Sequence, residues 1–160
     1  MNTKAESILH FYNMQMAEPE HTYFSEAGRG ELSGGGKSSW GMMYGLYCRS
    51  PDSFSRFHRL IVDEIWSFYE GDPFRLYLLY PDGSAEEVVM GTDYRAGQVY
   101  QFRIPAGVWQ GACLTDTGSY ALYGCTTVPA FTQACFEIGR KQDLLASYPQ
   151  QADWIQKLGL

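Results

Sequence analysis

The sequence lacks the features that mark several large classes of protein. Among its 160 residues, 12 Lys and Arg stand against 18 Asp and Glu, for a formal net charge of −6. Because binding to duplex phosphates needs a basic surface, this balance argues against a nucleic-acid-binding role. No stretch approaches the run of about 18 apolar residues that indicates a membrane span, so we expect no membrane partner.

Paired cysteines and an export signal are also missing. The four cysteines, at positions 48, 113, 125 and 135, form no Cys-x-x-Cys pair. The N-terminus has neither the basic region nor the apolar region of a signal peptide. We therefore expect a soluble, cytoplasmic protein whose cysteines are reduced.

Aromatic residues, in contrast, are plentiful, at 16% of a chain that is 45% hydrophobic. They suit β-strands and also the walls of a ligand cavity. Short apolar runs separated by turn signals, with no alternation of strand and helix, favour a single all-β barrel or sandwich. We expect strands beginning at Pro19 and covering 40–47, 58–62, 64–69, 74–80, 87–90, 99–104, 110–114 and 120–127.

Helical spacing occurs only near the two ends of the chain. Apolar residues at Ile8, Leu9, Tyr12 and Met16 predict one amphipathic helix from Thr3 to about Met16. Two short helices are expected over 140–148 and 151–158, separated by a proline. The expected division is an N-terminal helix in 1–18, a β-barrel in 19–139 and C-terminal helices in 140–160.

The Gly/Ser-rich stretch 28–39 contains Gly36-Lys37-Ser38, which is similar to the end of a phosphate-binding loop. That motif requires a glycine five positions before Gly36, where this chain has Glu31, and a helix after the loop. We predict instead a mobile loop at the mouth of the barrel.

The stretch from His58 to Gly71 places an imidazole and a carboxylate on apolar, strand-like sequence. If a tight turn at Val62-Asp63 joins two strands, Glu64 and Trp66 share one face and His58 can meet Glu64 across the turn. A carboxylate on a buried aromatic face is costly unless it is paired, hydrogen-bonded or bound to a cation. The sequence therefore allows two interpretations. One is a structural His–Glu pair inside a barrel, and the other is a site for a ligand or a metal.

The spacing of His58, Glu64 and Gly71 resembles the first cupin motif, His-x-His, three or four residues, Glu, six residues, Gly. The second motif, Pro-x-Gly-x-x-His, is similar to the run from Pro105 to Gln110. Other runs resemble the small Cupin_5 subfamily, a domain of unknown function, and they occur at 19–24, 54–59, 63–66, 71–73, 105–110 and 124–126. The resemblance covers most of the chain. It implies a double-stranded β-helix, or jelly-roll barrel, and a homodimer.

A complete cupin site presents three imidazoles and one carboxylate to a divalent metal. Here Leu60 stands at the second histidine position and Gln110 at the last. The resemblance leaves His58 and Glu64, with the Gln110 carbonyl as a weak third ligand. His21 adds a nitrogen only if its loop folds inward. We expect no tightly held cofactor, with a divalent metal at His58, Glu64 and Gln110 as the alternative.

Without a metal, His58 and Glu64 still form a pair that can move protons, because an imidazole titrates near neutrality. We place Tyr69 beside them as a hydrogen-bond donor, which makes His58, Glu64 and Tyr69 the predicted catalytic residues. The predicted ligand-binding residues are Tyr44, Trp66, Gln110, Tyr123 and Arg59. For the tyrosines the alternative is packing, and for Arg59 it is a surface position.

Three functions follow from these residues. The leading one is a pocket for a small polar or carbohydrate-like molecule, with isomerase or epimerase chemistry through His58 as acid and base. The second is a non-catalytic binding or sensing module. The third is a metal-dependent cupin enzyme of the oxygenase or isomerase type. The ligand is not identified by the sequence.

Overall fold

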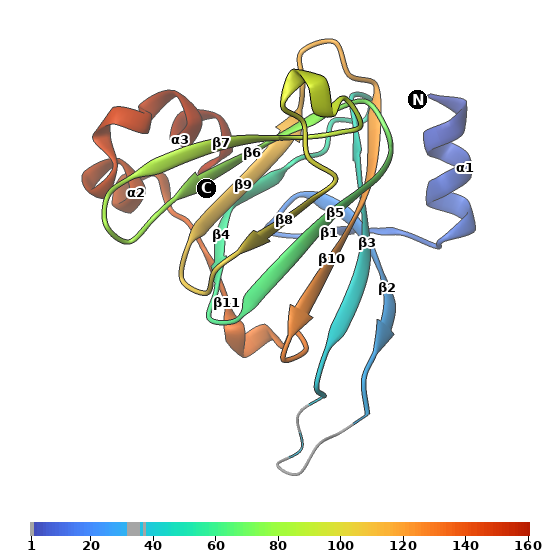
Figure 1. The fold of residues 1–160 in the computed structure, drawn as a ribbon, viewed down its shortest axis with the longest axis horizontal. Coiled ribbons are helices and arrows are strands. Elements are labelled where there is room, and N and C mark those ends of the chain that lie inside the picture. The colour runs from blue at the N-terminus through green and yellow to red at the C-terminus, as the bar shows by residue number, and fades with distance from the viewer. Residues whose placement is uncertain (1, 32–35, 37) are drawn as a thin grey trace.

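The computed structural model describes residues 2–31, 36 and 38–160, and these residues form two antiparallel sheets that face each other (Figure 1). The order is β1-β2-β3-β10-β5-β8 in the six-stranded sheet and β11-β4-β9-β6-β7 in the five-stranded sheet. The strands are β1 Gln15–Ala17, β2 Thr22–Arg29, β3 Gly41–Cys48, β4 Ser55–Leu60, β5 Asp63–Gly71, β6 Phe74–Leu79, β7 Ala85–Met90, β8 Gln101–Ile104, β9 Trp109–Leu114, β10 Tyr120–Val128 and β11 Phe136–Ile138. This architecture confirms the predicted all-β jelly roll.

From β3 onward the chain passes repeatedly from one sheet to the other. β4 pairs with β9 and β11 in one sheet, whereas β5 pairs with β8 and β10 in the other. The prediction that His58 and Glu64 meet across a tight hairpin-like turn is therefore wrong. They approach each other across the interior of the barrel, from opposite sheets.

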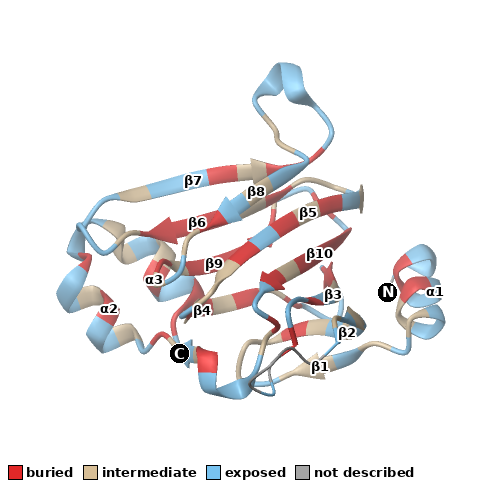
Figure 2. Cartoon of the chain, turned by 60° about the horizontal axis from the view of Figure 1, so that its bottom comes forward, coloured by how far each residue is buried: buried red, intermediate tan, exposed pale blue. Residues whose placement is uncertain are grey.

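The alternation predicted for β5 is confirmed. Glu64, Trp66 and Phe68 are buried, while Ile65 and Tyr69 are exposed on the other face of the strand (Figure 2). Because successive side chains of a strand point to opposite faces, the buried set enters the core between the sheets. Large side chains fill that core, among them Tyr47, Trp66, Phe74, Leu76, Met90 and Tyr123.

Helices cover the outer faces of the two sheets. α1 (Thr3–Phe11) packs Ala5 and Ile8 against the six-stranded sheet, and Figure 1 shows it beside β3. α2 (Lys141–Ser147) and α3 (Ala152–Leu158) cover the five-stranded sheet through Leu144, Ile155 and Leu158. The C-terminal helices thus lie where they were expected, and they leave the interior of the barrel to the strands.

The N-terminal helix is shorter than predicted. It ends at Phe11, because Asn13 takes a positive φ of 48° that interrupts the helix. The chain then forms β1, which pairs with β2. Met16 has helical spacing from Tyr12 but lies on a strand, so the boundary placed at 18 is wrong.

The Gly/Ser-rich stretch begins inside β2, which runs to Arg29, and ends just before β3 at Gly41. Residues 32–35 and 37, on which much of the predicted loop falls, lie outside the described residues. A strand rather than a helix follows, which agrees with the rejection of a phosphate-binding loop. Among the described residues, no helix is long and apolar enough to cross a membrane.

Candidate functional site

A cavity of about 400 Å³ opens into the barrel between the two sheets. Its apolar walls come from several strands and from the segment after β10, and they include Phe24, Met43, Leu60, Trp66, Tyr123 and Phe136. The polar residues that line it include Glu20, His58, Glu64 and Thr127. A largely apolar cavity with a few convergent polar groups has the character of a small-molecule site.

His58 reaches the cavity from β4. Its Nδ1 lies 2.8 Å from the carbonyl oxygen of Arg56, and since a carbonyl only accepts, Nδ1 donates the hydrogen. The ring stacks on Phe136 at a centroid distance of 5.3 Å. No described residue forms a hydrogen bond with Nε2. In the neutral imidazole, Nε2 is therefore a proton acceptor that a ligand can use.

Glu64 reaches the same cavity from β5, and it is only 6% exposed. Its Oε2 accepts hydrogen bonds from Gln110 Nε2 at 2.6 Å and from Trp66 Nε1 at 3.0 Å. Burial raises the pKa of this carboxyl above its ordinary value, and the nearby charge of His58 opposes the rise only in part. Glu64 thus holds a proton more readily than an exposed glutamate does.

This raised pKa makes a testable difference to stability. The folded protein binds the Glu64 proton more tightly than the unfolded chain, so Glu64 favours folding below the ordinary pKa of 4.5 and loses that contribution as the pH rises through the folded value. We expect Glu64→Gln, whose amide oxygen can still accept from Trp66 and Gln110, to gain stability relative to wild type between pH 4 and pH 8. Urea unfolding at both pH values measures this. An unchanged difference between the two proteins would contradict the raised pKa.

Trp66 and Tyr123, two of the predicted ligand-binding residues, line the cavity. Their rings stack at 4.9 Å with an angle of 6°, and Tyr47 stacks on the far side of Tyr123. The Tyr123 hydroxyl lies 2.8 Å from Thr22 Oγ1. Burial raises the pKa of Tyr123 well above its ordinary value, so its phenol stays neutral.

Tyr44 and Tyr69 do not lie at the cavity. Tyr69 is 51% exposed and its ring lies 6.0 Å from that of Tyr44, which packs against Tyr12 at a ring-centroid distance of 4.4 Å. The predicted placement of both in the pocket is wrong, because Tyr69 is five positions from inward-facing Glu64 and therefore points outward. Tyr44 belongs to the same outer face.

Arg59 also points away from the cavity. Its guanidinium lies 2.7 Å from Glu137 and 4.5 Å above the ring of Trp109. The neighbouring His58 faces inward, so alternation along β4 sends Arg59 outward. Its predicted role in ligand binding is corrected to a surface ion pair.

His21 does not supply a further ligand to the cavity. Its Nδ1 lies 2.9 Å from Glu18 and its ring lies against Phe54. The residue has a φ of 71°, in the left-handed region that favours glycine.

The residues at the cupin metal positions do not fit a transition-metal centre. The Gln110 carbonyl oxygen accepts from Trp66 Nε1 at 2.9 Å, and its amide nitrogen donates to Glu64. Leu60 has no donor atom. His58 and Glu64 alone remain, fewer than the three protein ligands that catalytic zinc sites use. In the described parts of the chain, no group of three or more His, Cys, Asp or Glu could hold a metal ion.

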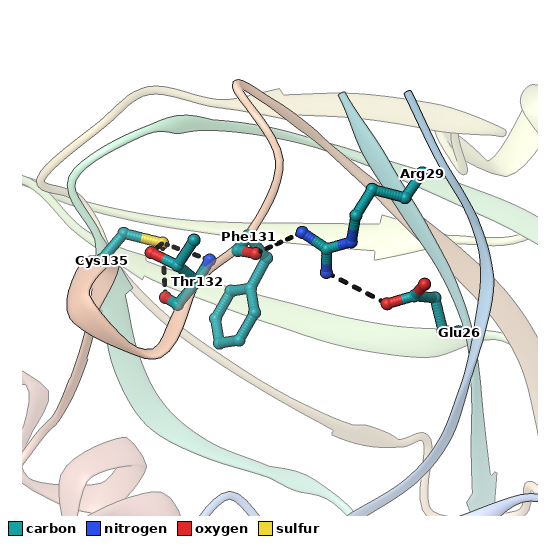
Figure 3. A network of polar contacts seen from close by, with 5 residues as sticks. All are labelled: Glu26, Arg29, Phe131, Thr132 and Cys135. Carbon is teal, nitrogen blue, oxygen red and sulfur yellow. Dashed lines mark hydrogen bonds and ion pairs between the residues drawn. The ribbon is translucent and has the colours of Figure 1, made fainter. Parts of the chain in front are cut away.

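Arg29, which lines the cavity, forms an ion pair within β2 and a hydrogen bond that joins β2 to the segment after β10 (Figure 3). Arg29 donates to Glu26 Oε2 at 3.0 Å and to the carbonyl oxygen of Phe131 at 2.9 Å. Sequence reasoning missed Arg29, Glu20 and Thr127 as cavity residues. Thr127 lies four residues after Tyr123 on β10, so alternation along the strand places both side chains on the same face. This spacing was the one sequence signal that could have placed Thr127 at the cavity.

Comparisons with known proteins agree with this structure. The sequence model of the family described as Cupin superfamily (DUF985), Cupin_5, matches residues 6–139. Protein SO0799 from Shewanella oneidensis is 30% identical with a TM-score of 0.89, and the match covers 98% of this chain and 97% of that one. A hypothetical protein from Leishmania major is 26% identical with a TM-score of 0.86, over 97% and 98% of the two chains.

A curated relative matches over a shorter segment. The uncharacterized protein YML079W from Saccharomyces cerevisiae is 35% identical over 69 residues, which are 42% of this chain and 34% of the yeast protein. Bacillus subtilis oxalate decarboxylase and the Streptomyces nucleoside dehydratase Pac13, at 11% and 13% identity, share the fold alone. On the family match and the fold together, the chain belongs to the Cupin_5 (DUF985) family of the cupin superfamily.

Proposed function

We propose that the cavity binds a small polar, carbohydrate-like molecule and that His58 acts on it as an acid and base, in isomerase or epimerase chemistry. One observation carries this proposal. The Arg56 carbonyl accepts the Nδ1 proton of His58, and no described residue bonds Nε2, in a cavity that Glu64 also lines. A neutral imidazole in this orientation can take a proton from a ligand and return it.

The environment of His58 supports such a transfer. When Nε2 takes a proton, the Glu64 carboxylate stabilises the resulting imidazolium through its charge. The apolar walls keep water from the ligand and strengthen that interaction. The fold does not choose the reaction, since cupin barrels of 11–13% identity include a decarboxylase and a dehydratase.

Two alternatives compete with this proposal. A non-catalytic binding module would use the same cavity, and would need only hydrogen bonds from His58 and Glu64. A metal-dependent enzyme is disfavoured, because Gln110 is engaged by Trp66 and Glu64 and does not line the cavity.

Extraction of co-purified small molecules, identified by mass spectrometry and returned to the protein in calorimetry, tests the proposal. Neighbouring residues of β4 supply a matched pair, because Leu60 lines the cavity and Arg59 does not. We expect Leu60→Phe, which adds bulk to the wall, to weaken binding by about tenfold or more, and Arg59→Ala to leave it unchanged. Equal binding by wild type and Leu60→Phe would place the ligand elsewhere.

We further propose that the protein acts in the cytoplasm as a homodimer. The outer face of the six-stranded sheet supports the dimer, since Met42, Ile65 and Tyr69 are large, apolar and exposed there. Met42 and Ile65 are both register partners of Thr126. Light scattering after size-exclusion chromatography should give twice the mass of the chain, and Tyr69→Glu should lower it. A wild-type monomer at micromolar concentration would contradict the dimer.

A further inference from the structure

Two carboxylates act on the interior of the cavity, from different parts of the chain. Glu64 comes from β5, and Glu20 comes from the turn that precedes β2. Both line the cavity. The negative charge of Glu20 helps to raise the pKa of Glu64, Tyr123 and Cys125. The charge of Glu20 therefore affects the protonation of buried side chains around the cavity.

Neither carboxylate is neutralised by an Arg or Lys among the described residues. Glu20 accepts a hydrogen bond of 2.8 Å from the Ser55 hydroxyl, and Glu64 accepts from Trp66 and Gln110. All these donors are neutral. Glu64 is buried, and a carboxylate removed from water is costly unless a cation balances it, whereas Glu20 is half-buried.

Among the described residues, Arg29 and His58 are the basic side chains that line the cavity, and Arg56, whose peptide N–H donates to the Glu20 carbonyl oxygen at 2.8 Å, does not line it. Arg29 pairs with Glu26 at 3.0 Å (Figure 3), and His21, which does not line the cavity, pairs with Glu18 at 2.9 Å. One imidazole thus faces two carboxylates. While both carboxylates are ionised, the inner cavity is negative whether or not His58 is protonated.

A second, independent observation also points to a missing partner. Thr127 lines the cavity and is 4% exposed, and its hydroxyl oxygen has no hydrogen-bond partner among the residues that the structure describes. It lies on β10 directly opposite Glu64 in the strand register. An unpaired buried hydroxyl costs about 1–3 kcal/mol, so a ligand that reaches it would recover that energy.

We propose that the ligand carries a protonated amine, which lies between Glu20 and Glu64, and a neutral polar group near Thr127. This inference rests on the proposed function and narrows its ligand class to amine-bearing polar molecules, such as amino sugars. The amine supplies the positive charge that the neutral donors do not. Carboxylate and phosphate ligands are disfavoured, because the two glutamates repel them.

Three probes of one shape test the charge directly. Benzylamine, benzyl alcohol and benzoate differ at pH 7 in carrying a positive, zero or negative charge. We expect wild type to bind benzylamine about tenfold more tightly than benzyl alcohol, and benzoate most weakly. Dissociation constants from ligand-observed NMR at constant ionic strength measure this, and they need no variant that could fail to fold.

A matched pair of variants then locates the charge. Glu20 and Glu86 each accept a hydrogen bond from a hydroxyl, but Glu86 lies on β7 and does not line the cavity. The preference for benzylamine over benzyl alcohol should fall at least threefold in Glu20→Gln, an order-of-magnitude expectation for one nearby charge, and persist in Glu86→Gln. Equal binding of amine and alcohol, no binding of any probe, or an unchanged preference in Glu20→Gln would overturn the proposal. The proposed function fails separately, if Leu60→Phe binds the extracted ligand as wild type does.

Discussion

The His58→Gln variant is expected to lose turnover of the cavity ligand by a factor of about 10² to 10⁴, the usual contribution of a general acid or base. Binding should remain within about tenfold of wild type, because glutamine still forms hydrogen bonds. Turnover should fall because the His58 ring is oriented for proton transfer: its Nδ1 proton is held by the Arg56 carbonyl, while Nε2 is available to the cavity. Glutamine cannot accept a proton at neutral pH.

The measurement is steady-state turnover and calorimetric binding of the extracted ligand by both proteins. His10→Gln is the matched control, since His10 is exposed on α1 and far from the cavity lining. Turnover by wild type alone, with binding by both, supports acid–base chemistry. Equal turnover by the two proteins would remove His58 from the reaction. If both proteins bind the ligand and neither converts it, the protein is a binding module.

The Trp66→Ala variant is expected to lose about 3–5 kcal/mol of folding free energy, the range for deletion of a large buried aromatic side chain. Trp66 is 1% exposed, and its ring stacks on Tyr123 at 4.9 Å. Its indole N–H also donates to both Glu64 and Gln110. The variant therefore leaves a cavity and removes a donor from a buried carboxylate, and the melting temperature should fall by roughly 10 °C.

Urea unfolding of Trp66→Ala and Trp40→Ala, each against wild type, makes the comparison. Trp40 is 39% exposed and precedes β3, so its loss should cost about 1 kcal/mol or less, as for most surface changes. The two substitutions delete the same side chain and differ in burial. A similar loss of stability in both would mean that Trp66 does not hold the two sheets together.

Much of the fold could be predicted because its signals are local. The alternation that buries Glu64, Trp66 and Phe68 repeats every two residues and is read directly from the sequence. The same rule, continued, places Tyr69 and Arg59 outward, so those two errors came from reasoning by residue type instead of by strand face. The end of α1 at Phe11 was missed, because the apolar spacing continues past Asn13 to Met16.

The sequence by itself determined the family, the jelly-roll class and the presence of His58 and Glu64 at one cavity. Only the tertiary structure decided that these two approach from opposite sheets, that Gln110 is engaged by Trp66, and that Glu20 and Thr127 complete the cavity. The physical reason is the range of the interactions. The direction of a side chain along a strand depends on its neighbours in sequence, whereas a cavity is built from segments as distant as Glu20 and Thr127, which the folding of the whole barrel brings together.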